Sequence, residues 1–178
     1  MSRHRSRPIK QGTLKYLQSA LEFFKKKHGL TSIDCQIEYK RHRDTSALVK
    51  YFRNFTTLGA YNIIDNKIRI YGCDYYPRNQ LVNTLFHELV HYWQTKIIKS
   101  LKRIVMVRSG EMCQDHYPDK PLINDWYHSY PKVTMRIAHN NVDTTNIDYR
   151  NKPHEIEARK LAEEMFQEWN TPEFKGKI

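Results

Sequence analysis

A helical pattern of apolar residues over residues 78–101 constrains the fold more than any other feature of the chain. Within it, apolar side chains recur at every third or fourth position: Val82, Leu85, Phe86, Leu89, Trp93 and Ile97. This spacing predicts a long helix with a buried face. Such a helix must pack that face against other elements, so the rest of the chain is expected to supply a sheet and further helices.

The segments before the long helix indicate one helix and several strands. Residues 13–28 show apolar positions at helical spacing, and Gly29 follows as a stop. Residues 33–39 alternate apolar and polar side chains, as a half-buried strand does. A further short strand is predicted over residues 47–53. Together these segments predict a helix followed by part of a small sheet.

A hairpin is predicted next, from residues 57–64 and 67–71. The two segments flank Asp65 and Asn66, which suit a two-residue hairpin turn. The order of helix, strands, long helix, irregular segment and helix predicts an α+β fold, with a small mixed or antiparallel sheet backed by helices.

The length of 178 residues suits a single domain. We expect residues 1–10 to form a basic flexible tail and residues 11–178 to form the domain. Within it, residues 103–150 are polar and dotted with aromatics and prolines, which indicates an irregular insert. Residues 153–169 predict a last helix, with Pro153 in its first turn, where proline is tolerated.

The long helix contains the sequence His-Glu-Leu-Val-His at residues 87–91. Histidines four positions apart lie about 40° apart around a helix, so His87 and His91 project from one face and can reach one Zn²⁺. Glu88 lies beside that face, where a carboxylate can take a proton from a water at the metal. The motif therefore predicts a zinc site with Glu88 as general base.

A catalytic zinc needs a third protein ligand and one position left for water. The last helix offers His154, Glu155 and Glu157, and periodicity does not choose among them. Glu155 has an ion-pair partner one turn on, Arg159, whereas Glu157 faces Leu161. Because Glu157 has no cation four residues further on, it is weakly favoured as the third metal ligand.

Two motifs resemble those of the small gluzincin-type zinc metallopeptidases of phages and mobile elements, the ImmA/IrrE group included. The first is Thr-Leu-Phe-His-Glu-Leu-Val-His at residues 84–91. The second is Glu-Ala-Arg-Lys-Leu-Ala at residues 157–162, close to the group's Glu-Ala-x-x-Phe-Ala. The hairpin before the long helix also looks like theirs. The resemblance implies a compact zincin-like domain that hydrolyses peptide bonds.

The same resemblance implies a set of site residues: His87, His91 and Glu157 as zinc ligands and Glu88 as the base. Two further side chains are candidates for binding substrate or an oxyanion. His154 lies one turn before Glu157, and Tyr149 belongs to the insert. A protein or peptide substrate is expected to add beside an edge strand, for which residues 58–63 are the candidate.

Charge predicts a second kind of partner. The chain carries thirty Lys and Arg against nineteen Asp and Glu, and residues 1–53 hold thirteen of the former and four of the latter. A basic N-terminal third can bind nucleic acid. The alternatives to a peptidase are therefore a nucleic-acid-associated protein resembling the SprT-like proteins, or a non-catalytic virion or assembly protein with a zincin fold. A later histidine such as His116 would be the third ligand in the SprT-like case.

No run of residues approaches the ~18 apolar positions of a membrane span, and the first residues show no apolar signal stretch. We therefore expect no membrane partner and a cytoplasmic location, in the host cytoplasm if the chain is phage-encoded. The three cysteines form no C-x-x-C pair, which argues against a disulfide scaffold or a cysteine-rich zinc module.

Overall fold

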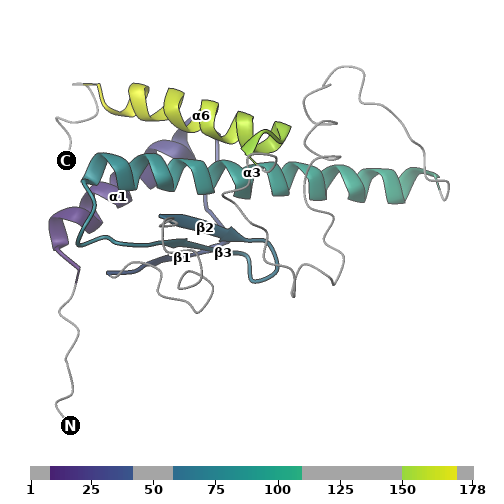
Figure 1. The fold of residues 1–178 in the computed structure, drawn as a ribbon. Helices are drawn as coiled ribbons and strands as arrows, with labels where there is room; N and C mark the ends of the chain where they lie inside the picture. Colours follow the sequence, from purple (N-terminus) through teal and green to yellow (C-terminus); the bar gives the residue numbers. More distant parts are fainter. Residues whose placement is uncertain (1–8, 42–57, 110–149, 172–178) are drawn as a thin grey trace, which may run out of the picture.

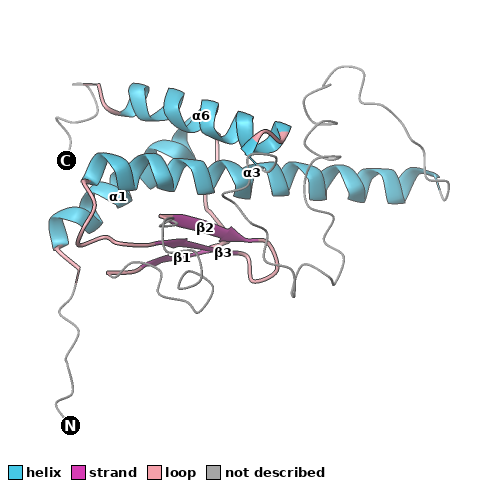
Figure 2. Ribbon diagram, viewed as in Figure 1, coloured by secondary structure: helices cyan, strands magenta, loops and turns pink. Residues whose placement is uncertain are grey.

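Helix α3 (Arg78–Ser109) lies between a small sheet on one side and helix α6 (Pro153–Trp169) on the other (Figures 1 and 2). The computed structural model describes residues 9–41, 58–109 and 150–171. The other elements in the described ranges are α1 (Gln11–Lys27), β1 (Gln36–Tyr39), β2 (Gly59–Asn62) and β3 (Lys67–Ile70). The predicted α+β class is confirmed.

The described strands form a mixed sheet in the order β1-β3-β2. Strand β1 pairs with β3 in parallel, and β2 pairs with β3 as an antiparallel hairpin. Along β3, Ile68 and Ile70 are fully buried, whereas Lys67 and Arg69 alternate with them on the other face. The sheet therefore turns its apolar face toward α3, as the predicted backing by helices requires.

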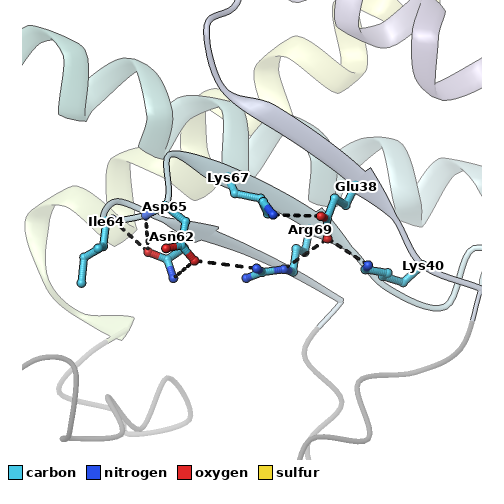
Figure 3. A network of polar contacts seen from close by, with 7 residues as sticks. All are labelled: Glu38, Lys40, Asn62, Ile64, Asp65, Lys67 and Arg69. Carbon is cyan, nitrogen blue, oxygen red and sulfur yellow. Dashed lines mark hydrogen bonds and ion pairs between the residues drawn. The ribbon is translucent and has the colours of Figure 1, made fainter.

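The opposite face of the sheet carries a charged network centred on Glu38 (Figure 3). The ammonium groups of Lys40 and Lys67 each lie 2.9 Å from the Glu38 carboxylate, and Arg69 Nε lies 3.4 Å from it. Hydrogen bonds from Lys40 and Lys67 lower the pKa of Glu38 to about 2. The network joins Glu38 of β1 and Lys40, which follows β1, to Lys67 and Arg69 of β3, and it makes this face of the sheet polar.

The first half of α3 is buried on several sides because the sheet, α1 and α6 all pack against it. Its completely buried side chains are Leu81, Val82, Leu85, Phe86, Leu89 and Val90. Helix α6 runs antiparallel to α3, and the fully buried Trp169 at its end packs edge-on against Tyr16 and Phe86. This packing holds the C-terminal end of α6 against α1 and the first half of α3.

Helix α1 ends where the sequence predicts. Gly29 has a φ of 62°, in the left-handed region, and the Leu30 N–H donates to the Lys25 carbonyl at 2.8 Å. These features form a Schellman motif. His28, the last residue before Gly29, stacks between Phe24 and Trp93 with ring centroids 4.4 and 4.8 Å away.

Three predicted boundaries were wrong. The hairpin connection spans four residues, 63–66, rather than two, because the Asn62 side chain accepts from the Ile64 and Asp65 N–H groups and Asn66 then adopts a φ of 48°. Helix α3 continues to Ser109, so the first residues of the predicted insert are helical. Strand β1 is shorter than predicted.

The predicted strand over residues 47–53 lies outside the described residues. No helix in the described part of the chain is long and apolar enough to cross a membrane.

Candidate metal centre

The two histidines of the motif meet on the face of α3 that looks toward α6. Their Nε2 atoms lie 3.1 Å apart, with the rings nearly perpendicular. The His91 side chain is buried, whereas that of His87 keeps 23% of its surface exposed. The helical spacing therefore brings two imidazole nitrogens to one point, and His87 is the more exposed of the two rings.

Helix α6 adds a carboxylate to the pair from its first turn. Glu155 Oε2 lies 3.5 Å from His87 Nε2, and Glu155 Oε1 lies 3.2 Å from His91 Nε2. The three side chains form a group whose ligand atoms all lie within 4.8 Å of one another. The Glu155 side chain is only 7% exposed. A buried carboxylate is costly unless it is paired with positive charge, so this position favours a cation.

Gln94 lies behind this group and is completely buried. Its Oε1 atom is 3.0 Å from His91 Nδ1, and its Nε2 atom donates to the His154 carbonyl at 3.1 Å. One amide thus contacts both ligand-bearing helices.

Glu88 is buried on the sheet side of the group, where its carboxylate accepts a hydrogen bond from the backbone N–H of Tyr61 in β2. Gly59 permits this close approach, since a Cβ atom there would lie 2.9 Å from Glu88 Oε1. Burial raises the pKa of Glu88, although His87 and His91 oppose the rise. Glu88 therefore lies close to the group with its carboxylate turned toward the strand.

The electrostatics of the group favour positive charge between the rings. Burial by itself would lower the pKa of His91, but the hydrogen bond and charge of Glu155 outweigh it and the net shift is upward. His154 behaves in the opposite way: burial, followed by the nearby His91, lowers its pKa to about 4. His154 is consequently a neutral ring at the edge of the group, with Nε2 3.8 Å from Glu155 Oε1.

The structure brings His87, His91 and Glu155 together, whereas Glu157 is half-buried and lies outside the group. Residues two apart on a helix point about 200° apart, so Glu155 and Glu157 cannot share a face. Glu155 belongs to the buried stripe of α6, which comprises His154, Glu155, Ala158, Ala162, Met165 and Trp169.

The ion pair between Glu155 and Arg159 that the sequence suggested is replaced by another contact. The Arg159 guanidinium donates a hydrogen bond to the Arg150 carbonyl. Glu155 lies three residues before the buried Ala158 and His154 lies four before it, so the helical spacing separates both from Glu157 but does not choose between them.

Of the other residues predicted to belong to the site, some lie within the described part of the chain and some lie outside it. Strand β2 lies at one edge of the described sheet, as predicted for residues 58–63. Tyr149 and His116 lie outside the described residues, as do residues 1–8 and 42–57, which carry much of the basic charge of the N-terminal third.

No protein-family model matches the chain, and neither a curated protein nor a solved structure matches it significantly.

Proposed function

We propose that the chain is a zinc-dependent metallopeptidase of zincin type, with His87, His91 and Glu155 as metal ligands and Glu88 as general base. The observation that carries the proposal is the convergence of two imidazole nitrogens and a carboxylate from α3 and α6, all within 4.8 Å. The resemblance of residues 84–91 to small gluzincin-type peptidases supports the same reaction class, with Glu155 in place of Glu157 as the ligand.

The spacing of the donor atoms suits zinc. Ligands about 2.0–2.1 Å from a tetrahedral ion lie roughly 3.3 Å from one another. The two Nε2 atoms lie 3.1 Å apart, and Glu155 contacts His91 Nε2 at 3.2 Å through Oε1 and His87 Nε2 at 3.5 Å through Oε2. Two histidines and one glutamate also form a ligand set found in catalytic zinc sites, where a fourth position stays open. The atom types therefore fit zinc, and with one oxygen taken from the carboxylate the donor atoms all lie within 4.8 Å of one another.

Zinc held by these residues would supply Lewis-acid chemistry, polarising a carbonyl and acidifying a water. Glu88 supplies the proton transfers. Its carboxylate accepts a proton from the attacking water and then passes it to the amine that leaves when the peptide bond breaks. The raised pKa of Glu88 suits a group that must both take and release a proton.

The substrate proposed for this site is a protein or peptide. The 23% exposure of His87 gives the group access to solvent, and β2 lies beside Glu88 at the edge of the described sheet. An extended peptide can pair with such an edge through main-chain hydrogen bonds.

Glu88→Gln tests the proposal because it keeps the size of the side chain and removes the proton acceptor. We expect the variant to retain one zinc per chain and to lose casein hydrolysis by about 10²–10⁴-fold. Glu157→Gln, a matched change on α6, should retain both. Loss of zinc from Glu88→Gln would make Glu88 a ligand. Zinc uptake by a wild-type protein that hydrolyses no casein or peptide mixture would favour the non-catalytic alternative.

A further inference from the structure

Gln94 is a completely buried amide one turn beyond the His-Glu-Leu-Val-His motif. Burying an amide is costly unless its donor and acceptor are both satisfied. The two bonds of Gln94 go to His91 and to the backbone of α6. The side chain therefore contacts the proposed ligand His91 directly. It also contacts the backbone of α6, the helix that carries the proposed ligand Glu155.

The direction of these bonds determines the state of the His91 ring. The His154 carbonyl can only accept a hydrogen bond, so the amide NH₂ of Gln94 must face it. The amide oxygen then faces His91 Nδ1, which must carry a proton in order to donate. In the neutral ring this leaves the lone pair on Nε2, the atom that faces His87 and Glu155. Gln94 thus selects the tautomer that can bind a metal.

The second bond acts on the position of the carboxylate. The His154 carbonyl belongs to the residue directly before Glu155, in the first turn of α6. By holding this carbonyl, Gln94 sets the start of α6 relative to α3. The position of Glu155 beside the two histidines depends on that register.

We propose that Gln94 is a positioning residue of the metal centre, which fixes the His91 tautomer and holds the first turn of α6 so that Glu155 completes the ligand set. This inference rests on the metal-ligand part of the proposed function and not on peptide hydrolysis. Groups that orient metal ligands typically contribute about 10–100-fold to metal affinity.

The test is the zinc dissociation constant, measured by competition with a chromophoric chelator, together with the thermal unfolding of each metal-free variant. Gln94→Met removes both hydrogen bonds with little change in shape, and we expect zinc affinity to fall by about 10–100-fold. Gln94→Glu keeps an acceptor for the His91 Nδ1–H and loses the donor to the His154 carbonyl. It should bind zinc more tightly than Gln94→Met while still losing thermal stability.

Thr95→Val is the matched control, since Thr95 is the next buried polar residue on α3. We expect it to change zinc affinity less than threefold. A double-mutant cycle examines the α6 bond: in a Glu155→Ala background, Gln94→Met should weaken zinc binding by a smaller factor than in the wild type.

The outcomes separate this inference from the proposed function. Equal zinc affinity in wild type and Gln94→Met, or equal weakening by Thr95→Val, overturns the positioning role alone. Equal affinity in Gln94→Met and Gln94→Glu overturns the tautomer argument. A wild-type protein that takes up no zinc overturns both the metal centre and the role of Gln94. Zinc uptake without hydrolysis, with Gln94→Met still weakened, overturns only the peptidase and supports the positioning role.

Discussion

Gly59 in β2 is in direct contact with Glu88 in α3: a Cβ atom on Gly59 would lie 2.9 Å from both Cγ and Oε1 of Glu88. Such an atom would also lie 2.6 Å from Thr84 Cγ2, one turn earlier on the helix. Separations below 3.0 Å require the neighbours to move. The edge strand and the proposed base can therefore adopt their arrangement only because residue 59 has no side chain.

The first prediction concerns that contact. Gly59→Ala should displace the Glu88 carboxylate and destabilise the fold by about 1–3 kcal/mol, as overpacking does. We expect peptide hydrolysis to fall while zinc content stays at the wild-type value. Gly12→Ala is the matched control, since its Cβ would meet only the flexible end of Arg78. A Gly59→Ala protein with full activity would show that the contact does not position the base.

Adding Thr84→Ser to Gly59→Ala separates packing from catalysis, because it removes the methyl group at 2.6 Å and leaves the clash with Glu88. Thermal stability should recover in part, whereas hydrolysis should stay low. Recovery of both would assign the effect to helix packing alone.

The second prediction distinguishes the two glutamates of α6. Glu155→Ala should lose zinc at chelator concentrations where Glu157→Ala keeps it, because Glu155 alone of the two lies against the histidines. Metal content after dialysis against graded chelator measures the difference. If Glu157→Ala loses the metal and Glu155→Ala retains it, the ligand set proposed above is wrong.

Metal removal provides the third prediction. The proposed ligands join α3 to α6, so zinc should stabilise the folded chain by mass action, by about 2.7 kcal/mol at a free concentration 100 times the dissociation constant. Tm should therefore fall when a chelator is added and recover with excess zinc. The Glu155→Ala protein should show a much smaller difference. A Tm that does not respond to zinc in the wild type would exclude this linkage.

The fourth prediction concerns pH and is independent of the metal. Burial, with a smaller effect of Lys27, lowers the pKa of His28, and its Nε2 atom has no hydrogen-bond partner among the described residues. The unfolded chain takes up a proton near the ordinary value of about 6.5, whereas the folded chain resists it. Stability should consequently fall as pH drops through this value.

His28→Phe keeps an aromatic ring between Phe24 and Trp93 and removes that titration. Urea unfolding with chelator present, at pH 7.5 and 5.5, should show a smaller loss of unfolding free energy in the variant than in the wild type. Parallel losses in the two proteins would mean that His28 does not titrate as its burial requires.

Local patterns predict most of the described elements. The helical spacing and the Gly29 stop locate α1, and Pro153 marks the start of α6, because these signals act within one or two turns. The hairpin turn is mispredicted because the Asn62 side chain competes with main-chain carbonyls for the Ile64 and Asp65 N–H groups. That competition depends on one side-chain rotamer and is not visible in the apolar pattern.

The site residues also divide into those that the local sequence predicts and those that depend on tertiary packing. The positions of His87 and His91 follow from helix geometry alone. The choice between Glu155 and Glu157 depends on which face of α6 meets α3, and that is decided by packing at Ala158, Ala162 and Trp169. The proposed role of Gln94 also depends on tertiary structure, since its second hydrogen-bond partner lies sixty residues further along the chain.

The separation of the proposed ligands along the chain has a consequence for biosynthesis. Glu155 follows His91 by 64 residues. At about 5–20 residues per second, a ribosome needs roughly 3–13 s to add that length. During this interval the nascent chain offers two histidines without their carboxylate. Under the proposed ligand set, tight capture of zinc waits for α6 to emerge and dock, so the proposed peptide-cleaving chemistry begins only after α6 has joined α3.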